Sequence, residues 1–309
     1  MIEVKNLTKR YGDHLAVDHL NFTVESGKIY GFLGPNGAGK STTMNIMTGY
    51  LGDTEGQVLI DGHDILKEPE EAKKNIGYLP EIPPLYMEMT VREYLEFAAE
   101  LKGIKKDKRE SQIEEVIRLA KLRDVENRLI QNLSKGYKQR VGLAQAVLGF
   151  PEIIILDEPT VGLDPKQIIE IRELIRKLAK KHTVILSSHI LAEVREVCDY
   201  IMIISGGKLV ASDTTENLEN MMSGKGQIEV EAKASRDEMD HIIRRTSASG
   251  ITTAQIIAKG GEDIREELFL AFSHADVPML TLNQSKTTLE EIFLELTQGS
   301  GNRMIKEEK

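Results

Sequence analysis

The stretch GPNGAGKST, residues 34–42, has the composition and spacing of a phosphate-binding loop. It matches the pattern G-x-x-x-x-G-K-[ST] and follows the strand-like segment KIYGFL. Glycines let the backbone curl until its N–H groups face phosphate oxygens, a lysine adds a charge for the β- and γ-phosphates, and a serine hydroxyl suits Mg²⁺. A glycine-rich turn without a ligand is the alternative. We expect a nucleotide to contact Gly34, Pro35, Asn36, Gly37, Ala38, Gly39, Lys40, Ser41 and Thr42.

A second candidate group is IIILDEP, residues 153–159, in which an apolar strand ends in two carboxylates. Strand ends of this kind lie at the carboxyl edge of an open α/β sheet, where ligands bind. Asp157 is placed to hold Mg²⁺, directly or through water, and Glu158 to polarise a water that attacks the γ-phosphate. Such a pair can also simply open a helix. The presence of a phosphate loop in the same chain favours catalysis, with Lys40 and Glu158 as catalytic residues.

A third stretch, LSKGYKQR at residues 133–140, directly precedes the helix-like run RVGLAQAVL. The first N–H groups of a helix have no partner inside the helix, and the helix dipole adds partial positive charge there. An anion would therefore be stabilised beside this helix start. These residues alone do not say which molecule supplies the anion.

The surrounding elements indicate an α/β fold. The opening runs IEVKNLTKRYG, LNFTVESGKIYGFLG and GQVLIDG predict short strands at the edge of a mixed sheet. From residue 88 to about 150 the apolar spacing becomes helical, beginning with a capping box at Thr90 and Glu93. IIIL and TVILSS then predict buried strands separated by the helix KQIIEIRELIRKLAKK. This alternation is typical of a parallel sheet with crossover helices.

The sequence loosens over residues 205–225, and a new set of elements follows. IEVEA, TTAQIIA and VPMLTL predict strands. The segments DEMDHIIRRT (237–246), EDIREELFLAF (262–272) and TTLEEIFLEL (287–296) predict helices. We therefore expect domains at 1–225 and 226–309, the second a small α+β module without a catalytic constellation.

Composition excludes some functions and leaves others open. The 49 acidic residues outnumber the 40 basic ones, for a net charge of -9, and there is no tryptophan, which argues against a nucleic-acid partner. Apolar runs such as IIIL and YIMII are too short to cross a bilayer, so any membrane role is expected to be peripheral. Cys198 is the single cysteine and is expected to be a packed thiol in a reduced compartment.

Taken in order, GPNGAGKST, LSKGYKQR, IIILDEPTVGLDP and VILSSH resemble the nucleotide-binding subunit of an ATP-binding cassette (ABC) transporter over residues 1–225. The resemblance implies a P-loop NTPase with a RecA-like core, an antiparallel β edge and a helical subdomain at about 88–150. The small C-terminal domain is similar to the accessory domain of exporter-type cassettes, including those of gliding motility, antibiotic export and related ABC-2 systems.

The resemblance also gives LSKGYKQR a role as the family's signature motif. In the family this motif binds the γ-phosphate of ATP that is held by the phosphate loop of a second subunit. It implies that Ser134 and Gly136 contact that ATP. This chain carries Lys135 and Tyr137 where the family usually has glycine and glutamine. We interpret the motif as altered yet competent.

Four further positions match the family's pattern one by one. Tyr11 matches the aromatic that stacks on adenine, although a surface tyrosine is the alternative. His189, after TVILSS, matches the histidine that contacts the γ-phosphate and orders the attacking water. Asp164 matches the loop that crosses between subunits, but could equally cap the next helix. Glu81 stands where the family has glutamine and keeps an oxygen for Mg²⁺ or its water.

The resulting hypothesis is an ATP-binding and hydrolysing subunit, with ATP and Mg²⁺ as cofactors, that powers integral membrane permease subunits and acts as an exporter. It would work at the cytoplasmic face of the cell membrane, paired with an identical or different nucleotide-binding subunit. The segment IPPLY, residues 82–86, would belong to the surface that receives the permease. One rival is a soluble ABC ATPase acting as a nucleotide switch, and another is a nucleotide-binding module without turnover. A single phosphate loop and the lack of sustained heptads favour transport over the switch.

Overall fold

The computed structural model describes residues 1–218, 227–232, 247–248, 252–257, 265–275, 277–285, 293 and 297. The chain divides into one compact unit that contains Met1–Asp213 and a second unit formed by Thr214–Gln298. The helices expected at 237–246 and 287–296 lie outside the described residues, apart from Phe293.

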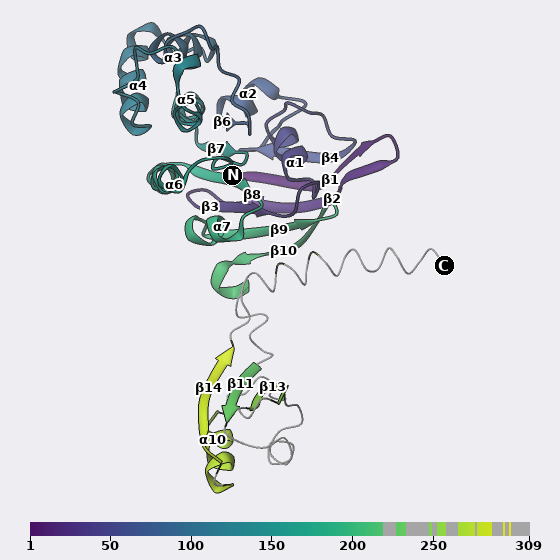
Figure 1. Ribbon diagram of the computed structural model, residues 1–309. Coiled ribbons are helices and arrows are strands. Elements are labelled where there is room, and N and C mark those ends of the chain that lie inside the picture. Colours follow the sequence, from purple (N-terminus) through teal and green to yellow (C-terminus); the bar gives the residue numbers. More distant parts are fainter. Residues whose placement is uncertain are drawn as a thin grey trace. The chain divides into compact units, whose positions relative to one another are not determined.

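The first unit is built on a six-stranded sheet with the order β10-β9-β3-β8-β7-β6 (Figure 1). The pairs β9–β3, β3–β8, β8–β7 and β7–β6 are all parallel. The strands are β3 (Ile29–Leu33), β6 (Ile76–Leu79), β7 (Ile153–Leu156), β8 (Thr183–Ser188), β9 (Tyr200–Ser205) and β10 (Lys208–Thr214). The predicted parallel sheet with crossover helices is therefore confirmed.

The opening strands form a separate four-stranded antiparallel sheet, in the order β2-β1-β4-β5. Its strands are β1 (Ile2–Tyr11), β2 (His14–Val24), β4 (Glu55–Ile60) and β5 (His63–Asp64). The sequence placed KIYGFL among edge strands, and this was wrong. All five residues of β3 are buried in the middle of the parallel sheet. A strand covered on both faces is apolar throughout, and IYGFL has this composition.

The two sheets share one hydrophobic core with α1. Phe22 of β2 and Phe32 of β3 meet edge to face with ring centroids 5.2 Å apart. Met44 and Met47 of α1 are fully buried in the same cluster. Burying side chains of this size stabilises the fold by about 1.5–3 kcal/mol each. The core therefore fixes the start of α1, and with it the phosphate loop, relative to both sheets.

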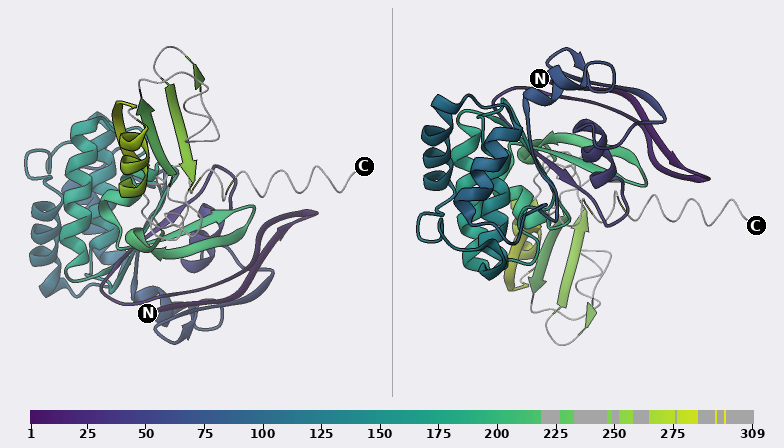
Figure 2. Two further views of the ribbon diagram at one scale, coloured as in Figure 1. Left: turned by 90° about the horizontal axis from the view of Figure 1, so that it is seen from below. Right: turned by 90° about the horizontal axis from the view of Figure 1, so that it is seen from above.

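The described residues of the first unit include eight α-helices or helical turns around these sheets (Figures 1 and 2). Helices α3, α4 and α5 form a group within residues 88–150, and α3 begins with the predicted capping box of Thr90 and Glu93. The helices are α1 (Lys40–Met47), α2 (Pro69–Lys74), α3 (Val91–Leu101), α4 (Lys106–Leu119), the 3₁₀ turn η1 (Ile130–Asn132), α5 (Lys135–Val147), α6 (Pro165–Ala179) and α7 (Leu191–Val197).

The described part of the second unit is a four-stranded antiparallel sheet, order β12-β13-β11-β14, with one helix. These elements agree with the strands predicted at IEVEA, TTAQIIA and VPMLTL and with the helix predicted over EDIREELFLAF. They are β11 (Gln227–Ala232), β12 (Ser247–Ala248), β13 (Thr252–Ile257), α10 (Arg265–His274) and β14 (Met279–Ser285). In neither unit do the described residues include a helix of the length and apolarity needed to traverse a bilayer.

Candidate active site

The phosphate loop connects β3 to α1. Gly39 caps α1 in the left-handed region, with φ of 102°, where a side chain would also come within 2.6 Å of the carbonyl oxygen of Ala16. A Cβ on Gly34 would lie 2.4 Å from the carbonyl oxygen of Ile204. The backbone thus needs glycine at both positions. Their absence of side chains lets the loop curl tightly above the start of α1.

Lys40 is the first residue of α1 and is buried, with 6% of its surface exposed. Its ammonium donates hydrogen bonds to the carbonyl oxygens of Gly34 at 2.8 Å and Pro35 at 3.3 Å. The same ammonium lies 3.7 Å from Oε1 of Glu158. A buried cation therefore stands between the phosphate loop and the end of β7.

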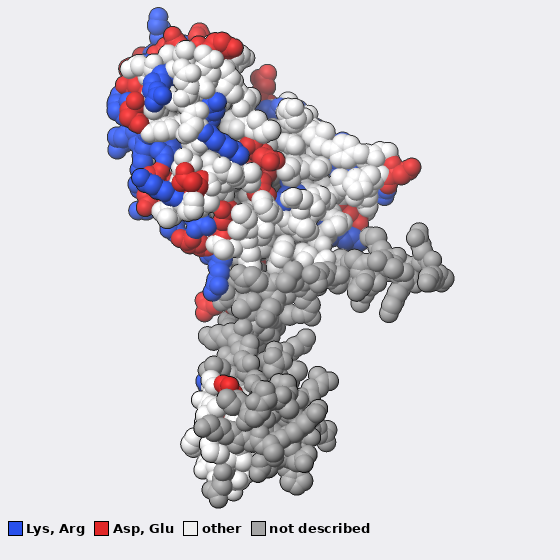
Figure 3. Space-filling view, viewed as in Figure 1, with Lys and Arg blue, Asp and Glu red and all other residues white. Residues whose placement is uncertain are grey.

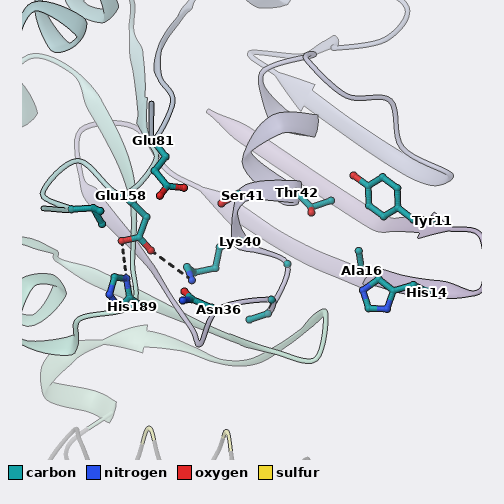
Figure 4. A pocket seen from close by; sticks show the side chains of 14 residues that line it. Tyr11, His14, Ala16, Asn36, Lys40, Ser41, Thr42, Glu81, Glu158 and His189 are labelled. Atoms are coloured by element: carbon teal, nitrogen blue, oxygen red, sulfur yellow. Dashed lines mark hydrogen bonds and ion pairs between the residues drawn. The ribbon is translucent and has the colours of Figure 1, made fainter. Parts of the chain in front are cut away.

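A cavity of about 430 Å³ opens over this loop (Figure 4). Tyr11 and His14 lie at one end, and Glu158 and His189 lie at the other (Figure 4). Of the residues predicted from the sequence, the cavity is lined by Tyr11, Asn36, Gly37, Ala38, Gly39, Lys40, Ser41, Thr42, Glu81, Glu158 and His189. Gly34 and Pro35 take part through the carbonyl groups that bind Lys40. The cavity thus brings together segments that are up to 178 residues apart in the sequence, from Tyr11 to His189.

The cavity also contains residues that the sequence analysis did not single out. His14 is paired with Tyr11 across the two-residue turn that joins β1 and β2. The turn signal Gly-Asp between these strands could have indicated this pairing. Ala16 and Val161 line the cavity as well, and no local pattern pointed to either of them.

The two carboxylates that follow β7 are both buried, with 3% of Asp157 and 7% of Glu158 exposed. Ser187 of β8 donates a hydrogen bond to Oδ1 of Asp157 at 2.5 Å and accepts one from the N–H of Glu158 at 2.9 Å. Glu158 has a φ of 47°, a strained value for a residue with a side chain. The bond from Ser187 helps to hold this backbone. Ser187 could not be predicted from the sequence, because its contact with Asp157 depends on the register of neighbouring strands.

Glu158 lies between two nitrogen-bearing side chains. Its Oε2 is 3.0 Å from Nδ1 of His189, and its Oε1 faces the ammonium of Lys40 (Figure 4). A carboxylate in this position can accept a proton from a water that enters the cavity, while the imidazole fixes its orientation. The predicted meeting of Lys40, Glu158 and His189 is present in the structure.

Ser41 and Asp157 provide oxygen donors for a divalent cation, because the hydroxyl of Ser41 lies 3.3 Å from Oδ1 of Asp157. Glu81 lines the same cavity. Within the described residues, no group of three or more His, Cys, Asp or Glu is arranged to hold a metal. Mg²⁺ commonly takes only one or two protein ligands and completes its shell with water and phosphate oxygens. The residues thus fit a cation bound together with a nucleotide rather than one held by protein alone.

Ser134 and Gly136 do not line the cavity. Ser134 is the exposed N-cap of α5, and its hydroxyl accepts a hydrogen bond from the N–H of Tyr137 at 3.4 Å. Gly136 lies against Gln167, since a Cβ at this position would come within 2.4 Å of that side chain. The helix start predicted from the sequence is present, but in a single chain it lies outside the Lys40 cavity.

The two unusual residues of the motif are engaged within their own chain. The ammonium of Lys135 lies over Gly162, where an added Cβ would be 2.1 Å from it. The hydroxyl of Tyr137 donates a hydrogen bond to Asp124 at 2.5 Å, and this bond raises the pKa of Tyr137. Neither side chain therefore occupies the space beside Ser134.

Asp164 is the N-cap of α6 and forms a capping box with Gln167. Its carboxylate accepts a hydrogen bond from the N–H of Gln167 at 3.0 Å. Asp164 does not line the cavity either. The helix-cap alternative considered for this residue is therefore present within the single chain.

The chain is similar to known ATP-binding proteins of transporters. The family model described as ABC transporter matches residues 17–161. The bacitracin transport ATP-binding protein BcrA of Bacillus licheniformis is 36% identical over 309 residues, covering 97% of this chain and 98% of that protein. The linearmycin resistance ATP-binding protein LnrL of Bacillus subtilis is 31% identical over 305 residues, covering 96% of this chain and 98% of that protein.

Solved structures agree with these matches. One, described as the ATP-binding subunit of an ABC transporter, has a TM-score of 0.66 and 32% identity, covering 72% of this chain and 92% of that one. A dimeric ATP-binding cassette in a post-hydrolysis state, bound to ADP and Pi, has a TM-score of 0.63 and 28% identity, covering 69% of this chain and 98% of that one. The predicted P-loop NTPase cassette fold is thereby confirmed. The chain belongs to the ABC transporter ATP-binding proteins and is an ATP hydrolase of that family.

Proposed function

We propose that this chain powers a separate membrane permease and that the complex is an exporter. Two relatives that match nearly its whole length are named for bacitracin transport and linearmycin resistance, which supports export of a toxic compound. The observation that carries the proposal is the position of Glu158 between Lys40 and His189 in the cavity of the phosphate loop.

In the proposed mechanism the chain contributes mainly charge and orientation. Lys40 and the N–H groups of the loop neutralise the β- and γ-phosphates of ATP. Glu158 accepts the proton of the attacking water, and His189 keeps the carboxylate in place. Ser41 and Asp157 would hold Mg²⁺, with Glu81 close to it, and the cation would neutralise phosphate charge. Tyr11 would stack on the adenine.

A second nucleotide-binding subunit is part of the proposal. Ser134, the exposed N-cap of α5, and Gly136, which is buried against Gln167, lie outside the cavity of their own chain. They form a helix start that suits an anion. A head-to-tail partner would bring this start over the triphosphate held by Lys40. The dimeric relative bound to ADP and Pi supports such pairing.

We predict that Gly136→Asp lowers ATP hydrolysis at least tenfold, because like charges placed across an interface cost several kcal/mol. ATP binding to the single chain should change little, since Gly136 is not in its cavity. Turnover and ATP affinity measured side by side would test this. Gly136→Asn is the matched control, because asparagine has the size of aspartate and meets Gln167 in the same way without adding charge. Equal turnover of the two variants would contradict the trans contact.

A second cavity, a surface groove of about 820 Å³, supports the proposal of a permease partner because it could receive part of that protein. Tyr50 and Ile82, both 82% exposed, contribute to its lining, and Glu81 lines it together with the ATP cavity. An apolar helix of the permease bound in this groove would therefore touch Glu81, which also lines the ATP cavity. This would keep the subunit at the cytoplasmic face of the membrane.

Charged residues of both signs gather over α3, α4 and α5 (Figure 3). The ammonium of Lys102 lines the groove and donates hydrogen bonds to the carbonyl oxygens of Gln145 and Leu148 at 2.9 and 2.7 Å. Desolvation of this ammonium lowers the pKa of Lys102 to about 8. Lys102 opens the basic segment KGIKKDKR, residues 102–109, which leads into α4. Within it, Arg109 donates a hydrogen bond to the carbonyl oxygen of Ile104 at 2.7 Å. The proposed permease contact thus has an apolar centre and a charged border.

We predict that Ile82→Asp lowers recovery of the subunit with its co-expressed permease by about tenfold, because it buries a charge in the apolar contact. The ATPase rate of the detached subunit should stay within about twofold. Quantitative co-purification from detergent-solubilised membranes is the measurement. Ile169→Asp on α6 is the matched control, since Ile169 is 55% exposed and does not line the groove. Unchanged recovery of Ile82→Asp would count against the groove as the permease contact.

A further inference from the structure

Glu193 is a buried carboxylate in the first turn of α7, with 6% of its surface exposed. Its Oε2 accepts hydrogen bonds from the hydroxyl of Thr160 at 2.5 Å and from the hydroxyl of Ser188 at 3.2 Å. Among the ion pairs of the described part of the chain, none involves Glu193. Burying a carboxyl group costs free energy unless its hydrogen bonds compensate, so the two hydroxyl donors are needed to hold Glu193 in this position.

The two partners of Glu193 flank the site of hydrolysis. Thr160 follows Glu158 by two residues, and Ser188 directly precedes His189. The hydroxyl of Ser188 also accepts a hydrogen bond from the N–H of Ile190 at 3.0 Å, which closes a turn around His189. One carboxylate oxygen thus joins the segment that carries Glu158 to the turn that carries His189.

The backbone of Glu158 makes this link significant. Its φ of 47° is in the left-handed region, and such a conformation persists only where the surroundings hold it. Ser187 binds the N–H of Glu158, and Thr160 ties the following residues to Glu193. Loss of the Glu193 carboxylate would free the chain after Glu158 and the turn at His189 at the same time.

We propose that Glu193 is a positioning residue for ATP hydrolysis, which sets the 3.0 Å contact between Glu158 and His189 through Thr160 and Ser188. This inference rests on the roles proposed above for Glu158 and His189. It assigns no contact between Glu193 and ATP, because Glu193 does not line the cavity. Its effect is therefore confined to the orientation of groups that do.

The test compares Glu193→Ala, Thr160→Val and Thr160→Ser. Glu193→Ala should lower kcat by about 10- to 100-fold, since small displacements of catalytic groups have effects of this size. ATP affinity, measured by direct titration, should stay within about threefold, because the phosphate loop is not part of this network. Thr160→Val keeps the shape but removes the hydroxyl, and should lower kcat. Thr160→Ser restores the hydroxyl and should return kcat to near the parental value.

Glu196→Ala is the matched control on the same helix, because Glu196 is half exposed and pairs with Arg172 rather than with this network. Its kcat should equal that of the parent. Parental kcat in Glu193→Ala, or equal loss in Thr160→Val and Thr160→Ser, would overturn the inference. If Glu193→Ala does not fold, as judged by circular dichroism, the Thr160 pair decides. Glu158→Gln assayed in parallel distinguishes failure of the inference about Glu193 from failure of the proposed function. Full activity in Glu158→Gln would overturn the proposed role of Glu158 itself.

Discussion

Glu158→Gln should lower the rate of ATP hydrolysis by about 10² to 10⁴ while ATP remains bound. Glutamine has the same shape and can still contact His189, but it cannot take up the proton of an attacking water. The phosphate loop and Lys40 are unchanged, so ATP affinity should stay within about threefold of the parental value. Single-turnover hydrolysis together with equilibrium binding of ATP would measure both quantities.

Glu152→Gln is a suitable control for this experiment. Glu152 directly precedes β7, six residues before Glu158, and it is exposed, so the same chemical change can be made there outside the site. It should hydrolyse ATP at the parental rate. A Glu158→Gln protein that also does so would show that another group activates the water, and would remove the role proposed for Glu158.

Lys40→Met should weaken ATP binding by about 10- to 100-fold and reduce hydrolysis at saturating ATP further. The magnitude follows from charged hydrogen bonds, which contribute about 1.5–3 kcal/mol each, where 1.4 kcal/mol corresponds to a factor of ten. Methionine keeps the length of the side chain but cannot neutralise phosphate charge. Isothermal titration with ATP and a steady-state assay are the measurements.

Loss of Lys40 also removes the hydrogen bonds to Gly34 and Pro35, so stability must be followed separately. A thermal unfolding curve without nucleotide gives this contribution. Lys28→Met, at a partly exposed lysine that pairs with Glu25, controls for the loss of a positive charge elsewhere. Parental ATP affinity in a folded Lys40→Met protein would contradict the assignment of the cavity as the triphosphate site.

Much of the site could be predicted from the sequence because its parts are local. The phosphate loop is nine consecutive residues, 34–42, whose glycines and lysine act through their own backbone turn. The helix caps at Thr90, Ser134 and Asp164 are also local, since each bonds to an N–H three residues later. Patterns of this kind need no knowledge of the rest of the fold.

Other parts of the site could not be predicted because they depend on contacts between distant segments. Ser187 meets Asp157 only because β7 and β8 pair with Leu156 opposite Leu186, which places the two following residues side by side. Glu193 joins Thr160 to Ser188 only after α7 packs beside the same sheet. A serine or glutamate at these positions carries no local signal of such a partner.

The sequence by itself determined the phosphate loop, the carboxylate pair after a buried strand, the α/β class and the helix start at Ser134, because each of these follows from neighbouring residues and their periodicity. Only the tertiary structure decided that the opening strands form their own sheet, that Glu158 lies between Lys40 and His189, and that Ser134 stays outside that cavity. The physical reason is that strand register and helix packing are set by burial of the whole core, which joins residues far apart in the chain.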